Sequence, residues 1–382
     1  MVMLFKENIM QPKAGPRVWL EIDHRVVKSN FEHIAAKVAS SKVLAVLKAD
    51  GYGLGGLPIA KTLLAAGAAR VGVAEPNEAY ALMELGCDLQ IMSAVFPEEV
   101  PDLIRAGVTL PITDLKMAKF IGETALKMGM TAKGHVKLDT GMGRLGILIE
   151  EADEIVPACC SVPGLEAEGI FTHFPMGYMA HGEFTRHQID LFKGLLTRLE
   201  AKGIRFKYRH CANSDAINHC PEAVREPFNL VRAGLNLHGL FDPVEDGGSY
   251  VAPVLSLKTR LVSVRDLPAG RSIGYSATYR LDKPTRVGTI AAGYADGFPL
   301  ALSNRGHVLI RGKVCPIIGR ISMDYTTVDL TQAPDAVPGD VVTCIGRDGN
   351  ESISTEEWAR LKGTHPYDII CSFSNRVKRV HV

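Results

Sequence analysis

The sequence lacks the features that would place the protein in a membrane or on nucleic acid. Its 382 residues contain no apolar run of the roughly 18 residues that a transmembrane helix needs. The formal net charge is only +1, and no basic cluster stands out that would bind nucleic acid or anionic lipid. Residues 1–16 lack the apolar core and cleavage site of a signal peptide. We therefore expect a cytoplasmic protein with no nucleic-acid or membrane partner.

The cysteine and histidine patterns give no indication of disulfides or of a metal site. The 8 cysteines are scattered, none forms a C-x-x-C pair, and the neighbours Cys159 and Cys160 could not easily bridge. We expect reduced and mostly buried thiols. The histidines nearest to a cluster follow no recognised ligand spacing, so we expect no metal site. They are His173, His181, His187 and His210.

A regular alternation of short apolar runs and amphipathic stretches occupies most of the chain. Such runs occur at 43–48, 70–74, 89–94, 108–112, 134–139, 168–173, 208–212 and 229–234. The amphipathic stretches include 57–67, 76–86, 114–129 and 183–203. Eight strands with intervening helices predict an α/β fold, a (β/α)₈ TIM-type barrel. The alternative is an open doubly wound sheet, and the number of strands favours the barrel.

The pattern changes after residue 250. Strand-like segments follow one another at 254–265, 272–279, 285–294, 307–318, 323–330, 340–346 and 367–381, and only 353–362 has helical spacing. Proline and glycine separate these segments, as is typical of all-β domains. We expect a cofactor-binding barrel over 17–250 and a mostly β C-terminal domain over 251–382. Residues 1–16 are expected to pack with the second domain.

Lys48 lies at the point where a core strand meets a glycine-rich loop. Residues 43–47 are apolar and partly β-branched, and glycines follow at positions 51, 53, 55 and 56. Partial desolvation there would lower the pKa of the amine and make it a nucleophile or base. The alternative is a lysine that merely extends from the strand end into water. A phosphate-binding P-loop is excluded because its lysine follows the glycines.

Other strand ends also carry polar side chains, and a barrel would bring them to one mouth. Taken singly, His173 could be scaffolding, Ser214 could be a helix N-cap, and Arg232 could pair with any acid. Together the groups suit a phosphorylated carbonyl cofactor such as pyridoxal 5′-phosphate, with a Schiff base at Lys48 and the phosphate near Ser214 and Gly234. The polar groups are Lys48, Lys137, Asp139, Arg144, Thr172, His173, His210, Ser214 and Arg232.

The chain resembles the alanine racemase family, a family of pyridoxal-phosphate enzymes of fold type III, in eight motifs that occur in order. The resemblance covers residues 17–382, essentially the whole chain. The motifs are AVLKADGYGLG (45–55), HVKLDTGMGRLG (135–146), THF (172–174), NSDA (213–216), VRAGLNLHGL (231–240), IGYSATY (273–279), AAGYADGFP (291–299) and GRISMD (319–324).

The resemblance implies a role for each barrel residue. Lys48 would hold pyridoxal phosphate covalently, and Arg232, supported by His173, would face the pyridine nitrogen. Arg144 would contact the ring oxygen and orient the substrate, and Lys137 matches a carbamylated lysine of the family. The cofactor phosphate would be bound by Tyr52, Ser214, Gly234 and Leu235.

The resemblance also implies a homodimer with shared active sites that interconverts L- and D-alanine, a peptidoglycan precursor. Tyr275, from the partner subunit, would be the second base beside Lys48, and Met323 would lie near the substrate carboxylate. Arg232 adds a physical argument. Because a guanidinium does not readily lose its proton, the pyridine nitrogen would stay unprotonated and the ring would withdraw electrons weakly. That disfavours a fold-type III decarboxylase or an aminotransferase.

Two positions depart from the family pattern. Asn375, in SNRVKR (374–379), stands where the family often has tyrosine in a stretch resembling SYRVPR. The smaller residue suggests that serine is also a substrate, so the alternative is a broad-specificity or serine-preferring racemase. Leu54 replaces a frequent histidine, to which we attach no mechanism. A non-catalytic pyridoxal-phosphate carrier is a further alternative, but it would leave the β domain that carries Tyr275 without a purpose.

Overall fold

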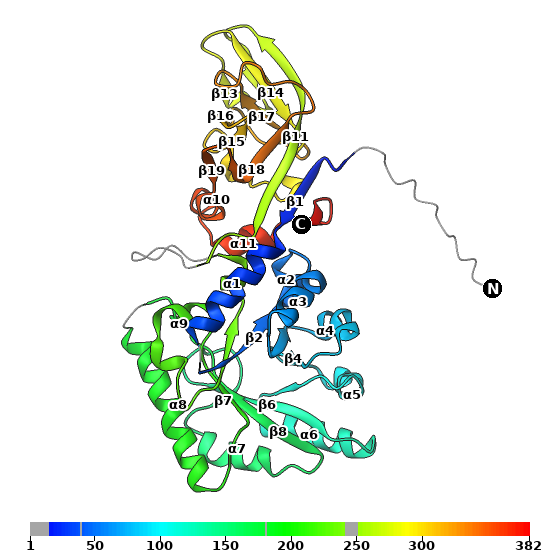
Figure 1. Cartoon of the computed structure of the whole chain (residues 1–382), viewed down its shortest axis with the longest axis vertical. Coiled ribbons are helices and arrows are strands. Elements are labelled where there is room, and N and C mark those ends of the chain that lie inside the picture. Colours follow the sequence, from blue (N-terminus) through cyan, green and yellow to red (C-terminus); the bar gives the residue numbers. More distant parts are fainter. Residues whose placement is uncertain (1–14, 39, 180–181, 241–250) are drawn as a thin grey trace, which may run out of the picture. The chain divides into compact units, whose positions relative to one another are not determined.

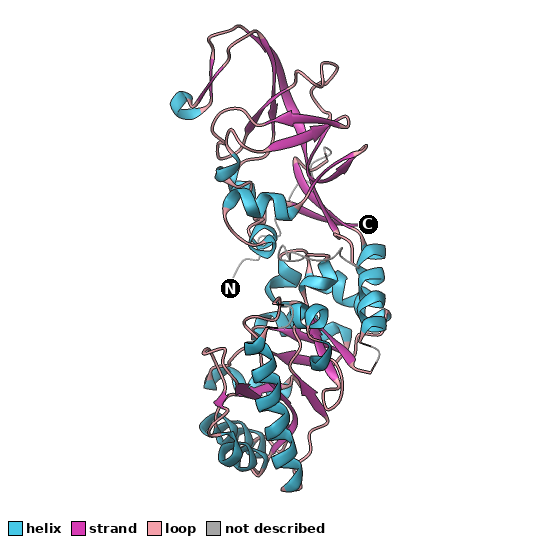
Figure 2. Cartoon of the chain, turned by 90° about the vertical axis from the view of Figure 1, so that its left-hand side faces the viewer, coloured by secondary structure: helices cyan, strands magenta, loops and turns pink. Residues whose placement is uncertain are grey.

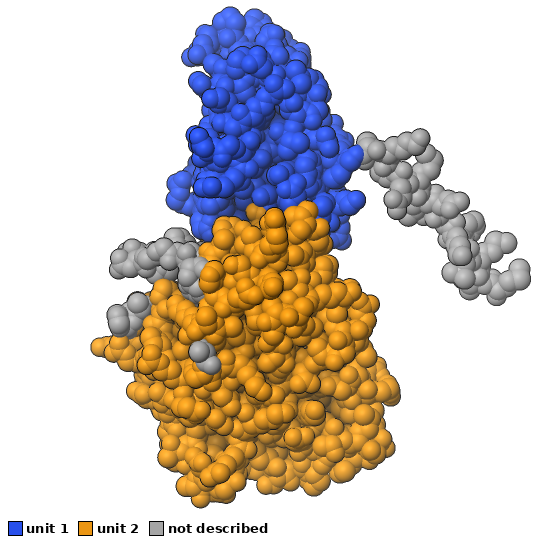
Figure 3. Space-filling view, in the orientation of Figure 1, with its two compact units in different colours: residues 1–21, 256–363, 373–380 blue, residues 22–255, 364–372, 381–382 orange. Residues whose placement is uncertain are grey.

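The computed structural model describes residues 15–38, 40–179, 182–240 and 251–382 (Figure 1). These residues fall into two compact units (Figure 3). One unit comprises the chain up to residue 21 with 256–363 and 373–380, and the other comprises 22–255, 364–372 and 381–382. The expected packing of residues 1–16 concerns a segment of which 1–14 lie outside the described residues.

Eight parallel strands of residues 22–255 form a closed barrel. Two strand groups, β10-β2-β3-β4 and β5-β6-β8-β9, are joined by the bridge between Gln90 and Thr109. On the other side the N–H of Arg232 donates to the Ala212 carbonyl at 3.0 Å. The barrel is thus confirmed and the open sheet is wrong. The strands are β2 (Lys42–Val46), β3 (Arg70–Val73), β4 (Leu89–Ile91), β5 (Leu110–Ile112), β6 (Ala132–Asp139), β8 (Leu165–Phe171), β9 (Tyr208–His210) and β10 (Leu230–Ala233); β7 (Ile147–Leu148) pairs with β6.

Helices lie outside these strands (Figure 2). Their apolar faces follow the helical period, as in α8, which buries Ile189, Phe192 and Leu196. Side-chain caps set three of the starts, since Asp23, Asp114 and Asn213 accept N–H groups of the first turns of α1, α6 and α9. The helices are α1 (His24–Lys37), α2 (Lys48–Tyr52), α3 (Gly56–Ala65), α4 (Pro76–Leu82), α5 (Val100–Arg105), α6 (Leu115–Lys127), α7 (Ala152–Cys160), α8 (Glu183–Ala201) and α9 (Ser214–His219).

The other unit is built on a 9-stranded sheet with the strand order β16-β15-β18-β11-β1-β20, to which β14, β17 and β19 are attached. Its strands are β1 (Val18–Ile22), β11 (Leu255–Leu267), β14 (Thr285–Ile290), β15 (His307–Ile310), β16 (Lys313–Pro316), β17 (Thr326–Asp329), β18 (Val341–Asp348), β19 (Glu351–Ile353) and β20 (Lys378–His381). A separate pair consists of β12 (Ser272–Ile273) and β13 (Tyr279–Arg280), and the helix α10 spans Thr355–Lys362.

Single-turn 3₁₀ helices connect many of these elements. They are η1 (Met83–Leu85), η2 (Pro97–Glu99), η3 (Pro221–Ala223), η4 (Leu235–His238), η5 (Tyr275–Ala277), η6 (Tyr294–Asp296) and η7 (Leu300–Leu302).

Three predicted strands of the C-terminal region were wrong in extent. The segment 367–381 begins as the helix α11 (Pro366–Cys371), because Pro366 at its first turn presets a helical φ, and only β20 is a strand. The segment 307–318 is the hairpin β15–β16, which reverses at Arg311 and Gly312, both with positive φ. The segment 272–279 contains β12 and then η5 instead of one strand.

Candidate active site

A cavity of about 710 Å³ opens at the carboxyl ends of the barrel strands. That volume is typical of small-molecule sites, which span roughly 300–1,000 Å³. Nine of the residues singled out in the sequence line it: Lys48, Tyr52, Lys137, Arg144, His173, Ser214, Arg232, Gly234 and Leu235. Tyr275 and Met323 belong to the other unit, where the two residues are 70% and 52% exposed.

A left-handed turn positions Lys48 and Tyr52. Directly after Lys48, residues 49–52 have φ values of 52, 52, 65 and 59°. L-residues avoid this region at a cost of roughly 1–2 kcal/mol each. Hydrogen bonds offset the cost, since Glu78 accepts the N–H groups of Ala49 and Ala74, at 2.5 and 2.7 Å. The sequence predicted a glycine-rich loop here but not its handedness.

The Lys48 amine faces the open cavity in a cationic environment. Burial lowers its pKa, the like charge of Arg144 adds to that effect, and Cys371 and Glu78 oppose it. Its Nζ lies 5.9 Å from the centroid of the Tyr52 ring. A lysine with a lowered pKa supplies neutral amine at moderate pH, as a nucleophile or base requires.

Arg232 is held by neutral acceptors. Its Nη2 donates to the carbonyls of Thr172 and Cys211, both at 2.9 Å, and lies 3.2 Å from Nδ1 of His173. Its Nη1 lies 3.1 Å from Nδ1 of His210. Among the described residues no carboxylate contacts Arg232, so it does not form an ordinary ion pair there. Burial lowers the pKa of Arg232 to about 10, which still leaves it protonated at pH 7.

Ser214, Gly234 and Tyr52 form a compact cradle. The Ser214 hydroxyl accepts the N–H groups of Gly234 and Asn236, at 3.0 and 3.4 Å. A Cβ at Gly234 would lie 2.5 Å from the Tyr52 hydroxyl, so this close approach requires glycine. Burial raises the pKa of Tyr52, which stays a neutral hydroxyl donor. The N-cap of α9 is Asn213, so the interpretation of Ser214 as that cap is wrong.

Lys137 is a buried lysine on β6, only 5% exposed. Burial lowers its pKa to about 7, with Arg232 and Arg144 adding to the effect and Asp139 opposing it. Among the described residues its contact is with the Phe171 ring, whose centroid lies 4.6 Å from Nζ. The Asp139 carboxylate instead accepts four backbone N–H groups, those of residues 141–144, and so shapes the loop that carries Arg144.

Sequence reasoning missed part of the cavity wall. His365, which precedes α11, and Tyr367 on α11 line it, with their rings stacked 5.1 Å apart. They were missed because 367–381 was predicted to be a strand; Pro366 was the available signal for a helix start. Asn375 is an exposed residue of the other unit, and Leu54 is completely buried.

The cavity suits an anionic ligand. Among the described residues four cationic side chains line it, those of Lys48, Lys137, Arg144 and Arg232, against the one carboxylate of Asp215. Within the described ranges no group of three or more histidine, cysteine or acidic residues could hold a metal ion. No helix in the described part of the chain is long and apolar enough to span a membrane. Fold and site together define a (β/α)₈-barrel protein with a pocket lined by lysine and arginine side chains and an additional β domain.

Comparisons with known proteins agree with that class and specify the family. Residues 22–242 match the alanine racemase N-terminal domain and residues 254–381 match the C-terminal domain. The chain belongs to the alanine racemase family. It is 36% identical to the alanine racemase of Desulforamulus reducens, over 96% of this chain and 99% of that one. It is 37% identical to that of Carboxydothermus hydrogenoformans, over 96% and 99%.

Solved structures agree. The alanine racemase from the D-cycloserine producer Streptomyces lavendulae superimposes with a TM-score of 0.90 at 31% identity, covering 97% of this chain and 98% of that one. The Bacillus anthracis enzyme with bound L-Ala-P gives 0.87 at 32%, covering 97% and 96%. The Bartonella henselae enzyme, with covalently bound pyridoxal phosphate, gives 0.85 at 27%, covering 96% and 100%.

Proposed function

We propose that the protein is a pyridoxal-phosphate-dependent racemase that interconverts L- and D-alanine. The observation that carries the proposal is Lys48, a lysine of lowered pKa beside a cradle of donors in a cationic cavity. The names of the relatives support alanine as substrate. We place the enzyme in the cytoplasm, where its D-alanine would supply peptidoglycan synthesis.

The residues present fit the cofactor. Lys48 would bind its aldehyde carbon, and the cradle of Tyr52, Ser214 and Gly234, together with Leu235, would bind its phosphate. Covalent pyridoxal phosphate in the B. henselae relative supports this assignment. When bound, the cofactor supplies an electron-withdrawing ring that acidifies the α-hydrogen of an attached amino acid. The Arg232 guanidinium has only N–H donors, so it would donate a hydrogen bond to the ring nitrogen and leave that nitrogen without a proton of its own.

Racemisation needs one base on each face of the α-carbon. Lys48 would take or give the proton on one face, and Tyr275 of the partner subunit would do so on the other. Tyr275 is 70% exposed and lies in η5, where Ser276 and Ala277 have positive φ, as does Gly274 directly before it. An exposed phenol on a strained turn supports a role at an interface. We therefore propose a homodimer with shared active sites, in which Met323 lies near the substrate carboxylate.

Arg144 and Lys137 complete the proposed site. Arg144 lines the cavity from the loop shaped by Asp139 and would orient the anionic groups of cofactor and substrate. A lysine with a pKa of about 7 is partly neutral at physiological pH, as its reaction with CO₂ requires. We propose that Lys137 is carbamylated and that the resulting anion offsets the charge of Arg144.

The test of the function combines product chirality with cofactor attachment. The protein incubated with L-alanine should yield D-alanine until both enantiomers are equal. Lys48→Ala should lose this activity and the borohydride-reducible adduct. Lys42→Ala, which removes an exposed lysine at the start of β2, should retain both. A reducible adduct that persists in Lys48→Ala, or an adduct without racemisation in the native chain, would contradict the proposal.

Asn375 motivates a second candidate, a racemase that also accepts or prefers serine. A small amide in place of a phenol would leave room and a hydrogen-bonding group for a substrate hydroxyl. The measurement is the ratio of kcat/KM for L-serine to that for L-alanine. Asn375→Tyr should lower the ratio about tenfold, the usual size of one lost polar contact. Lys378→Ala, exposed on the same segment, should not change it. An unchanged ratio in Asn375→Tyr would refute the serine proposal alone.

A further inference from the structure

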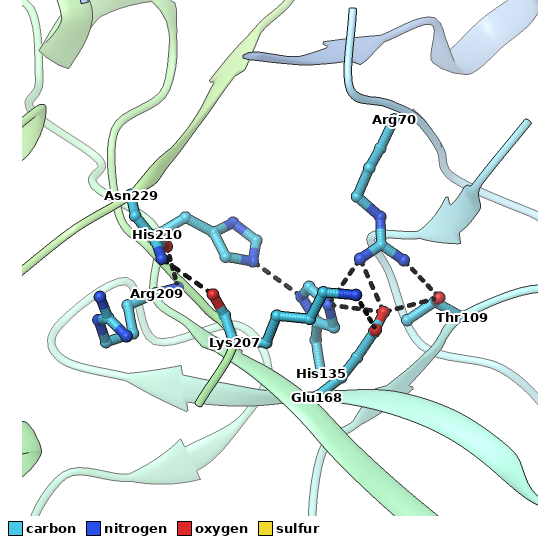
Figure 4. Close-up of polar contacts among 8 residues, drawn as sticks. All are labelled: Arg70, Thr109, His135, Glu168, Lys207, Arg209, His210 and Asn229. Carbon is cyan, nitrogen blue, oxygen red and sulfur yellow. Dashed lines mark hydrogen bonds and ion pairs between the residues drawn. The ribbon is translucent and has the colours of Figure 1, made fainter. Parts of the chain in front are cut away.

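A chain of buried polar side chains crosses the barrel interior from Arg232 to Glu168. Figure 4 shows His210, His135 and Glu168 of this chain. Nη1 of Arg232 lies 3.1 Å from Nδ1 of His210, and Nε2 of His210 lies 2.9 Å from Nδ1 of His135. Nε2 of His135 lies 3.4 Å from Oε1 of Glu168. The two histidines have no exposed surface, and the Glu168 side chain is 3% exposed. The four side chains belong to β10, β9, β6 and β8.

Packing fixes the orientation of both imidazole rings. His210 stacks on Phe171 with a centroid distance of 4.9 Å, and His135 stacks on Tyr208 at 5.6 Å. A Cβ at Gly169 would come within 2.5 Å of the His135 ring, so the glycine makes room for that ring. Because the rings are held in place, the property that can still vary is the tautomer, that is, which nitrogen of each ring carries hydrogen.

Both histidines are neutral at pH 7. Burial lowers the pKa of His135 to about 4, and it lowers that of His210 well below its usual value. A neutral imidazole has one donor and one acceptor nitrogen, so the two rings must share one direction along the chain. Either both carry hydrogen on Nε2 and donate away from Arg232, or both carry it on Nδ1 and donate toward Arg232.

Each direction places two donors face to face at one end. If hydrogen is on Nδ1, His210 directs an N–H at the Arg232 guanidinium, which has only donors. If hydrogen is on Nε2, His135 directs its N–H at Nη1 of Arg70, 3.2 Å away. At that end the Glu168 carboxylate contacts both groups, since its Oε1 accepts from Arg70 at 2.7 Å. An anion compensates two facing donors, and among the described residues no carboxylate contacts Arg232 at the other end.

We propose that Glu168, His135 and His210 are positioning residues for Arg232, acting through a one-way hydrogen-bond chain that runs from Arg232 to the buried carboxylate. The carboxylate selects the Nε2–H form of both rings, so that His210 offers Arg232 an acceptor. The charged Glu168 fits this role: burial alone would raise its pKa, but His135 and Arg70 lower it to about 2. The effect on turnover rests on the proposed racemase function, whereas the direction of the chain does not.

The test reads the ring nitrogens directly. Full-length enzyme with ¹⁵N-labelled histidine is examined by solid-state NMR at pH 7, with signals assigned from His135→Gln and His210→Gln. Both rings should carry hydrogen on Nε2 alone. Hydrogen on Nδ1 of either ring, or on both nitrogens of one ring, would overturn the proposal. A protein with the expected rings that racemises nothing would refute the proposed function and leave the chain standing.

Variants then test the role of the carboxylate. Glu168→Gln removes the charge and adds a donor, so both rings should shift toward hydrogen on Nδ1. The kcat for L-alanine should fall about tenfold with KM changed less than about twofold, because substrate contacts are intact. Thr109→Val is the matched control, since Thr109 bonds Arg70 and Glu168 but lies outside the path to Arg232. It should leave the ring signals unchanged. Unchanged ring signals in Glu168→Gln would overturn the role of Glu168.

Discussion

At the scale of single residues, Lys137 is the least hydrated amine of the candidate site. Its pKa of about 7 means that protonation during acidification would place a buried cation beside Arg232 and Arg144. Since only the neutral amine reacts with CO₂, the carbamylated fraction should be high above pH 7 and should fall as the pH drops through that value. Activity that depends on the carbamate should fall in the same direction.

The first prediction concerns this group. Lys137→Ala should lower kcat/KM for L-alanine about tenfold or more, the cost of losing one charge-assisted contact. In the native chain ¹³CO₂ should give a lysine carbamate signal by NMR that Lys137→Ala lacks. Lys133→Ala, an exposed lysine on the same strand, should keep both signal and activity. A native protein without the signal at pH 8 would show that Lys137 is an unmodified amine.

The sequence predicted those residues of the candidate site whose local sequence is unusual. Lys48 and Lys137 stood out because a cation rarely follows or interrupts an apolar strand. The chain of His210, His135 and Glu168 could not be found in this way. These residues belong to different strands, and their distances depend on the strand register and closure of the barrel. Singly, each resembles an ordinary buried polar residue.

At the scale of elements, the turn after β2 is the most strained part of the site. Four consecutive residues with positive φ cost free energy that only contacts outside the turn can offset. Glu78 provides one such contact, because each of its carboxylate oxygens accepts a backbone N–H. A local sequence cannot specify this handedness, since Ala49 does not favour it and the acceptor of its N–H group, Glu78, lies on α4.

The second prediction follows from that arrangement. Glu78→Gln replaces one acceptor by a donor that faces an N–H group, so it should destabilise the fold by about 1–3 kcal/mol in denaturant unfolding. Cofactor affinity should fall with it, because Lys48 and Tyr52 flank the turn. Glu84→Gln should cost less than about 1 kcal/mol, because its pair with Lys61 is on the surface. Equal stability of the two variants would mean that the turn holds without Glu78.

The element α11 illustrates why the C-terminal region was predicted less well than the barrel. Eight barrel strands repeat one pattern, so an error in one is corrected by its neighbours. The segment 366–371 has no such repeat, and its buried pair Ile369 and Ile370 suits a strand as well as a helix. Its helical form is settled by Pro366 and by packing against α2, a contact between segments more than 300 residues apart.

At the scale of the whole molecule, the proposed chemistry would combine residues of two chains. Lys48 lines a cavity of the barrel unit, whereas Tyr275 and Met323 are exposed residues of the other unit. In a head-to-tail dimer each site would combine Lys48 of one subunit with Tyr275 of the partner subunit. A subunit that lacks either residue would therefore still contribute the other one to its neighbour's site.

The third prediction uses this reciprocity. Lys48→Ala and Tyr275→Phe homodimers should each be inactive, since every site lacks one base. When equal amounts are unfolded and refolded together, half of the dimers should be mixed, and one of their two sites should carry both bases. About a quarter of native activity should therefore return by random pairing. Tagged purification confirms that mixed dimers form. Mixed dimers without activity would mean that Tyr275 does not act across the interface.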